Sequence, residues 1–278
     1  MSTPSTTAAR AEPIRVAIAG LGAIGFTVAQ ALDRGLPGFT LTAIGVRDRA
    51  KAEARLQSLR HPVPLVTIAE LEPLADLVIE CAPASILCSI AEPVLKAGKK
   101  VMILSVGALL TNEHLVELAR ASGGQIIVPS GALLGLDALL AAAEGEIRSV
   151  RMASRKPAQG FAGAPFLEER NIRIEDITEP LRIFSGSPRE AAVGFPANMN
   201  VAVALSLAGI GPDRTVLEIW ADPTITRNTH TIEVEADSAS FQMSIANVPS
   251  ENPKTSRITA LSVIATLRKM TAPLRLGT

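Results

Sequence analysis

The chain has 278 residues, of which 47% are hydrophobic, and its 27 basic residues balance its 27 acidic ones. This length and apolar content predict a large core divided between two subdomains. The zero net charge and the 3% aromatic content argue against a nucleic-acid partner, which needs basic and stacking surfaces. The longest apolar runs, such as 132–143, are too short and interrupted to predict a membrane span.

The amino terminus and the cysteines bear on location. Residues 1–11 are small and polar and lack the apolar segment of a signal peptide, so we expect a disordered lead-in. Cys81 and Cys88 have no histidine or cysteine partners at metal-binding spacing. We therefore expect neither a disulfide framework nor a metal site, which favours a reducing, cytoplasmic location.

Short apolar segments alternate with helical ones in the first half of the chain. The predicted strands are 14–20, 39–46, 75–82, 99–107 and 124–131, and the predicted helices run from the first glycine turn to about 34 and over 49–59, 85–98 and 112–122. Near-continuous apolar strands with short connections are typical of a sheet covered on both faces. The pattern predicts an α/β fold with a Rossmann-type, doubly wound parallel sheet, a dinucleotide-binding domain over 12–131.

The pattern changes after about residue 130. We expect a helix over 133–143 and a strand over 147–155, followed by a polar and loop-rich stretch to about 180. A further strand over 181–187 and a mostly helical segment over 189–209 come next. Three strands in sequence, 215–222, 230–237 and 240–247, precede a closing helix over 252–270. Sequential strands with alternating polarity predict a mixed or antiparallel sheet in a second α+β subdomain, 132–251, for substrate binding and dimerisation. The segment 252–278 is expected to pack back on the first domain.

A glycine-rich turn follows the first predicted strand. Gly20, Gly22 and Gly25 form the G-x-G-x-x-G pattern between a strand and a helix. Such glycines permit a tight turn, so that helix N–H groups can bind a pyrophosphate. We expect Ala23 and Ile24 to join them in cofactor binding; a tight turn that binds nothing is the alternative.

Charged residues end the second predicted strand. Asp48 lies near the position of the acid that binds ribose hydroxyls in this motif, although one or two residues late. Arg47 beside it could accept the 2′-phosphate of NADP, so the predicted cofactor is NAD or NADP. Alternatively, these charges cap the following helix.

Small residues follow the other strands of the predicted parallel sheet. Ligands bind beyond the carboxyl ends of such strands, so we expect Cys81, Ala82 and Ser105 to line the cofactor site. Because no histidine stands near it in the motif, Cys81 is interpreted as a small apolar residue rather than a nucleophile.

Three histidines are candidates for an acid/base with a pKa near neutrality. His61 lies in a proline-rich loop and His114 early in a helix, and both are expected to be solvated. His230 stands at the edge of the predicted strand 230–237, whose alternating pattern begins at Thr231. The pattern alone leaves His230 equally a catalytic residue or a turn residue.

Two lysines are candidates for binding substrate carboxylates. Lys156 and Lys254 each stand beside a proline at an element boundary, where site residues often lie. Lys254 also opens the last helix, whose N–H groups could bind a carboxylate. A solvated charge is the alternative for each. Asp222 either orients His230 or caps a turn.

Several motifs resemble the L-aspartate dehydrogenase family in order and rough spacing: GLGAIG, SVGAL, SGALLGLDAL, RKP, ANMNVAVALSLAG, ADPTITRNTH and ENPKTS. The resemblance covers about 14–270. It implies NAD(P)-dependent oxidative deamination of L-aspartate to iminoaspartate, which hydrolyses to oxaloacetate and ammonia, together with the reverse reductive amination. It also implies a homodimer.

The resemblance assigns roles to single residues. His230 matches the family's active-site histidine, and Ala132 and Asn200 match its cofactor contacts. The chain departs from the family at Thr231 and after Glu235, where relatives have HEI and a glycine-rich turn. These departures would fit an altered substrate preference. The alternative functions are another two-domain reductase, acting on a dihydrodipicolinate- or homoserine-like substrate, and a nonenzymatic dinucleotide-sensing protein.

Overall fold

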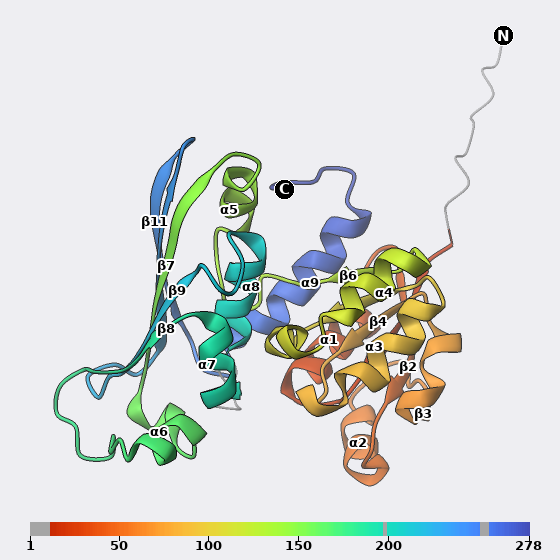
Figure 1. Cartoon of the computed structure of the whole chain (residues 1–278). Helices are drawn as coiled ribbons and strands as arrows, with labels where there is room; N and C mark the ends of the chain where they lie inside the picture. The colour runs from red at the N-terminus through yellow and green to blue at the C-terminus, as the bar shows by residue number, and fades with distance from the viewer. Residues whose placement is uncertain (1–11, 197–198, 251–255) are drawn as a thin grey trace.

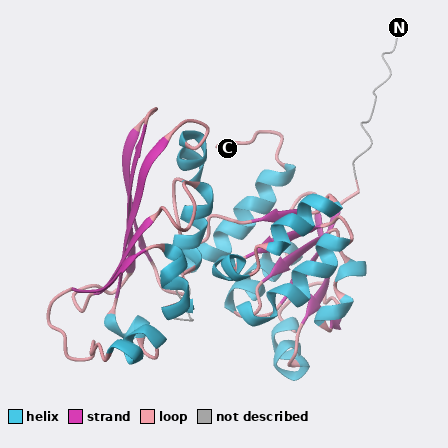
Figure 2. Cartoon of the chain, in the orientation of Figure 1, coloured by secondary structure: helices cyan, strands magenta, loops and turns pink. Residues whose placement is uncertain are grey.

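The computed structural model describes residues 12–196, 199–250 and 256–278 (Figure 1). The predicted lead-in 1–11 and the candidate Lys254 lie outside these described residues. Two units lie side by side, one a sheet enclosed by helices and the other a long sheet with helices against one face (Figure 2). Within the described part of the chain, no helix has both the length and the apolarity needed to cross a bilayer.

The first sheet is parallel, with the strand order β3-β2-β1-β4-β5-β6. Its strands are β1 (Ile14–Ala19), β2 (Phe39–Gly45), β3 (Leu65–Val66), β4 (Leu77–Glu80), β5 (Lys100–Ile103) and β6 (Gln125–Ile127). The order reverses between β1 and β4, which is the point where a doubly wound sheet opens for a ligand. The predicted Rossmann-type sheet is therefore confirmed.

Helices cover both faces of this sheet. They are α1 (Ala23–Asp33), α2 (Arg49–Leu56), α3 (Leu87–Lys96) and α4 (His114–Ser122), with 3-10 turns η1 (Ile68–Glu70), η2 (Glu72–Leu74), η3 (Ala84–Ile86) and η4 (Val106–Thr111). Because both faces are covered, all four residues of β4 are buried. Gly98 ends α3 in the left-handed conformation (φ 70°), as expected of a residue after a helix C-cap.

The second sheet is mixed, with the strand order β11-β10-β7-β9-β8. Its strands are β7 (Ile147–Lys156), β8 (Leu181–Gly186), β9 (Val216–Ala221), β10 (Asn228–Ala236) and β11 (Ser240–Asn247). Only β7 and β9 pair in parallel; the other pairs are antiparallel. The predicted mixed sheet is confirmed, and β7 lies between β9 and β10 although it precedes both in the chain.

Helices cover one face of the second sheet (Figure 1). They are α5 (Leu136–Ala142), α7 (Pro188–Gly194) and α8 (Asn200–Ala208). Val150 and Met152 of β7 are buried in the core that includes these helices, whereas Arg151 between them is exposed. The alternation follows from the two-residue period of a strand.

The closing helix α9 (Arg257–Thr271) packs on the first unit. Val263 and Leu267 are fully buried in the same core as Val28 and Leu32 of α1. The Thr271 hydroxyl donates a hydrogen bond of 3.1 Å to the carbonyl of Pro37. The chain therefore crosses to the second unit and returns.

Some predicted boundaries are wrong. The strand expected over 99–107 ends at Ile103, because the next two N–H groups turn to the side chain of Glu80. The stretch expected to be loop-rich contains η5 (Ala158–Phe161) and α6 (Pro165–Arg170), which bury Phe161 and Leu167.

Candidate active site

A cavity of about 280 Å³ lies where the carboxyl ends of β4, β5 and β6 meet the second unit. Eight residues predicted from the sequence line it: Ile24, Cys81, Ala82, Ser105, Ala132, Lys156, Asn200 and His230. The cavity therefore brings six of the predicted cofactor residues together with two of the predicted catalytic residues.

The glycine turn has the form that a pyrophosphate requires. Gly20 has a φ of 97°, and a Cβ on it would lie 2.6 Å from the carbonyl oxygen of Cys81. A Cβ on Gly25 would lie 2.1 Å from the carbonyl oxygen of Gly20. Gly22, the N-cap of α1, instead faces open space, with no atom within 4 Å of an added Cβ. This opening at the amino end of a helix fits the phosphates of a dinucleotide.

The charged residues after β2 have a local role in this structure. Arg47 and Asp48 are exposed, and the Asp48 carboxylate accepts a 3.1 Å hydrogen bond from the N–H of Lys51. Asp48 therefore caps helix α2, as the alternative interpretation expected. A contact between Asp48 and the cofactor ribose stays a prediction. Sequence reasoning missed Arg55, whose guanidinium donates to the carbonyl of Leu21 beside the glycine turn. No sequence signal marks Arg55, because α2 brings it there.

Ala132 and Asn200 each form a hydrogen bond with a distant segment of the chain. The Asn200 side-chain oxygen accepts a 2.9 Å bond from the N–H of Gly107, in the loop after β5. The carbonyl of Ala132 accepts a 3.0 Å bond from the side-chain amide of Asn247, a buried residue at the end of β11. The second unit thus fixes two of the loops that line the cavity.

His230 lies inside β10, not at the edge of the strand as the sequence predicted. The strand begins at Asn228, and His230 pairs with Ser154 of β7 and Ile245 of β11. Only 3% of His230 is exposed, and its Nδ1 atom has no hydrogen-bond partner among the described residues. Burial, helped by the charge of Lys156, lowers the pKa of the imidazole to about 3. The ring is therefore a neutral base.

Lys156 ends β7 and lines the same cavity as His230. Its ammonium group lies 5.7 Å from the centre of the Phe161 ring. Burial lowers the pKa of Lys156 to about 8. A bound anion would favour the charged forms of both Lys156 and His230.

Asp222 caps a turn in this structure. Its Oδ1 atom accepts hydrogen bonds from the N–H and the hydroxyl of Thr224, at 2.9 and 2.6 Å. Its Oδ2 atom lies 3.6 Å from the guanidinium of Arg155. Of the two roles considered for Asp222, the contacts match the turn cap.

The other two histidines lie outside the cavity. The His61 side chain is 80% exposed and lies 3.2 Å from a carboxylate oxygen of Asp33. The His114 side chain is 55% exposed. Both match the solvated positions expected for them.

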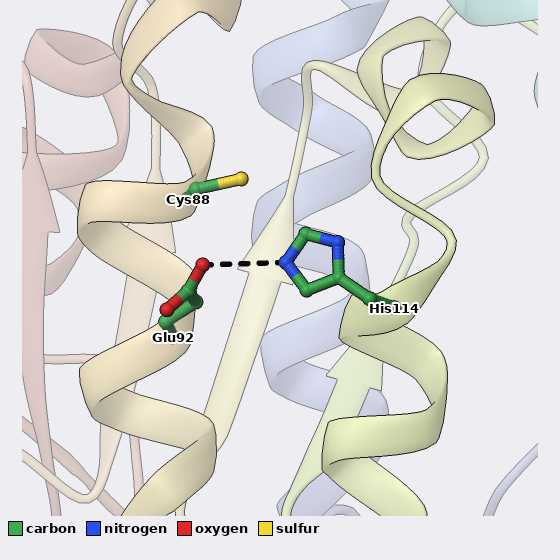
Figure 3. A group of neighbouring side chains, drawn as sticks. All are labelled: Cys88, Glu92 and His114. Atoms are coloured by element: carbon green, nitrogen blue, oxygen red, sulfur yellow. Dashed lines mark hydrogen bonds and ion pairs between the residues drawn. The ribbon is translucent and has the colours of Figure 1, made fainter.

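A group of possible metal ligands lies between α3 and α4. Cys88 and Glu92 of α3 face His114 at the start of α4, with ligand atoms within 4.8 Å of one another (Figure 3). The sequence predicted no metal site because His114 comes from a separate helix. Each side chain already has a protein partner: Cys88 bonds to Asn112, and Glu92 bonds to both His114 and Lys96. The contact between Glu92 and His114 links the two helices.

Two family models match the chain. The model described as "Aspartate dehydrogenase, C-terminal" matches residues 137–270. The model described as "Homoserine dehydrogenase, NAD binding domain" matches residues 20–129. Together they cover both units of the fold.

Relatives match along nearly the whole chain. The chain is 62% identical to the L-aspartate dehydrogenase of Bradyrhizobium diazoefficiens, covering 95% of this chain and 94% of that protein. It is 61% identical to L-aspartate dehydrogenase 3 of Bordetella bronchiseptica, covering 96% and 98%. The crystal structure of aspartate dehydrogenase from Thermotoga maritima has a TM-score of 0.73 at 24% identity, covers 95% of this chain and 99% of that one, and shows the shared fold.

Proposed function

The chain belongs to the L-aspartate dehydrogenase family, and we propose that it oxidises L-aspartate to iminoaspartate with His230 as the acid/base. Iminoaspartate then hydrolyses to oxaloacetate and ammonia, and reductive amination is the reverse reaction. One observation carries the proposal: a neutral, buried histidine and a lysine line one cavity at the carboxyl ends of the parallel strands.

The enzyme uses NAD or NADP. The open turn at Gly22 and the amino end of α1 would hold the pyrophosphate, and Ala82, Ser105, Ala132 and Asn200 would lie along the rest of the cofactor. The bound nicotinamide supplies the hydride acceptor. The protein's task is to orient the substrate carbon toward it.

His230 has the properties of the required base. The substrate ammonium must lose a proton before the carbon–nitrogen bond becomes an imine, and a neutral imidazole can accept it. Two substrate carboxylates nearby would raise the pKa of His230 from its value in the empty cavity. Once that proton has passed to solvent, the neutral ring can take a proton from the water that attacks the imine.

Lys156 is proposed to bind a substrate carboxylate. A carboxylate beside it would offset the cost of burying its charge, which its lowered pKa reflects. Lys254, the other candidate, lies outside the described residues, and its role stays a prediction.

The departures from the family pattern lie away from the cavity. Thr231 is next to His230 in β10, so its side chain points to the other face of the sheet, where its hydroxyl lies 3.4 Å from that of Ser244. The Glu235 carboxylate at the end of β10 accepts a hydrogen bond from the hydroxyl of Ser240, the first residue of β11. Neither residue lines the cavity, which supports L-aspartate as the substrate.

The proposal includes a homodimer in the cytoplasm. Cys81 and Cys88 are both free thiols, which suits a reducing compartment. The face of the second sheet opposite α8 is free of helices in Figure 1 and offers a broad surface to a second copy.

The direct test follows the absorbance of reduced cofactor while purified protein turns over L-aspartate with NAD⁺ or NADP⁺. We expect His230→Ala to lower kcat/KM by about 10²- to 10⁴-fold, the usual contribution of a general base. His114→Ala, which removes an exposed histidine outside the cavity, is the matched control and should retain activity. No turnover with either cofactor, or full activity in His230→Ala, would overturn the proposal.

A further inference from the structure

Glu80 is a buried acid that the sequence analysis did not select. It is the last residue of β4, has no exposed surface, and lines the cavity. An acidic residue is rarely buried fully unless its carboxylate is paired or hydrogen-bonded. The reason for its burial must therefore lie in its partners.

The Glu80 carboxylate accepts four hydrogen bonds. Oε1 accepts from the N–H of Ala82 at 2.9 Å and from the hydroxyl of Ser105 at 3.0 Å. Oε2 accepts from the N–H groups of Leu104 and Ser105, at 3.1 and 2.8 Å. Three of the four donors are backbone N–H groups, which can only donate, so the bonds favour the ionised carboxylate. Burial raises the pKa of Glu80, and these bonds act against that rise.

The four donors come from two loops that follow neighbouring strands. Ala82 follows β4, and Leu104 and Ser105 follow β5; all three line the cavity with Glu80. The side chain therefore joins the two cavity-lining loops after β4 and β5, beside the point between β1 and β4 where the strand order reverses. Its negative charge lies in the wall of the cavity. Among the described residues that line this cavity, the other charged one is Lys156.

We propose that Glu80 is a positioning residue that holds the β4 and β5 loops in their cofactor-binding form and favours oxidised over reduced cofactor. The nicotinamide ring is a cation when oxidised and neutral when reduced, so a fixed carboxylate in the cavity wall attracts the oxidised ring more strongly. The inference rests on the family's use of NAD(P). It requires neither aspartate as substrate nor a catalytic role for His230.

The test measures the dissociation constants of NAD⁺ and NADH by calorimetry, without amino acid, or of the phosphorylated pair if the wild type prefers it. Glu80→Gln keeps the size of the side chain and removes its charge. We expect affinity for the oxidised form to fall about tenfold more than affinity for the reduced form, since the removed Coulomb attraction acts on the cationic ring alone. Equal losses for both forms would overturn the charge role, and unchanged affinities would overturn the whole proposal.

Two further variants separate charge from loop position. Glu80→Asp keeps the charge but shortens the reach to the loops, so both affinities should fall together; a selective loss of the oxidised form would contradict this. If Glu80→Gln does not fold, Glu80→Asp still tests the role of Glu80 in holding the loops. Glu92→Gln removes one negative charge from α3, outside the cavity, and should leave the ratio of affinities unchanged.

These measurements are independent of turnover. An enzyme inactive on aspartate would still show the difference between oxidised and reduced cofactor. An active enzyme whose Glu80→Gln variant binds both forms like the wild type would retain the proposed function and lose this inference.

Discussion

At the scale of single residues, His230 couples the active site to stability. Its pKa is about 3 in the folded protein and 6.5 ordinarily. Between these values the unfolded chain binds a proton that the folded chain does not, so stability falls as pH decreases below about 6.5. At pH 5 the expected loss is about 2 kcal/mol. Urea unfolding at pH 7 and pH 5 measures this loss. The free energy of unfolding should fall less between these pH values in His230→Gln than in the wild type.

The wild type, measured at the same two pH values, is the reference for that experiment. If His230→Gln and the wild type lose the same free energy of unfolding between pH 7 and pH 5, the imidazole is not held neutral by its surroundings.

Lys156 illustrates the opposition between binding and stability at one residue. Its pKa falls from 10.5 to about 8 because burial penalises the ammonium. The unfolded chain therefore binds more protons between these values, and this contribution makes the protein more stable as pH rises from about 8 to 10.5. Lys156→Met should raise Tm at pH 7 and raise KM for aspartate about tenfold or more, as thermal unfolding and steady-state kinetics would show.

Lys96→Met serves as the matched control, since Lys96 is an exposed lysine of α3 paired with Glu92. It should leave KM unchanged and alter Tm little, because surface ion pairs contribute about 0–1 kcal/mol. An unchanged KM in Lys156→Met would remove Lys156 from the substrate site.

At the scale of elements, two glycines of the same turn have different roles, Gly25 in folding and Gly22 in cofactor binding. A Cβ at position 25 would lie 2.1 Å from the Gly20 carbonyl oxygen, so Gly25→Ala should cost about 1–3 kcal/mol of stability through overpacking. A Cβ at Gly22 meets no protein atom within 4 Å. Gly22→Ala should therefore cost the apo protein only the weaker helix cap that alanine provides, below about 1 kcal/mol, and weaken cofactor binding about tenfold. Thermal unfolding and calorimetry distinguish the two; unimpaired cofactor binding by Gly22→Ala would contradict a phosphate site there.

The order of elements was predictable wherever local pattern and tertiary environment agree. The parallel strands are apolar because both faces are covered, so β1 and β4 could be recognised from their sequences. β10 was placed too late because Asn228 and Thr229 are polar, and pairing with β7 and β11, not their own character, extends the strand through them. The helical segment 189–209 divides at Phe195, where α7 ends and the ring enters a cluster with Phe161 and other aromatic side chains. No local pattern reveals such tertiary contacts.

At the scale of the whole molecule, the cavity combines residues from both units. The cofactor side was predictable because the glycine motif is local, and the resemblance to a family supplied His230 and Asn200. Glu80 and Arg55 could not be predicted, because their significance comes from loops and helices that only the fold brings beside them. Residues recognised by motif thus depend on neighbours that carry no motif.

The uncovered face of the second sheet carries the last prediction, which concerns assembly. Trp220, the one tryptophan of the chain, stacks there with Arg155 and Arg182, whose guanidinium carbons lie 4.6 and 5.9 Å from its ring centre. Tryptophan and arginine are enriched at protein interfaces. We expect light scattering to give twice the 29.1 kDa mass of one chain, and Trp220 fluorescence to change on dilution as the dimer dissociates.

Charge reversal tests the face itself. Arg151 is exposed on β7 and lies opposite Glu233 of β10. Arg151→Glu places two like charges opposite each other on the proposed interface, and should shift the protein toward monomer at concentrations where wild type is dimeric. Arg34→Glu, at an exposed position after α1 in the first unit, should leave the mass unchanged. A monomeric wild type at all concentrations would contradict the dimer, whereas a dimeric Arg151→Glu would place the interface on another surface.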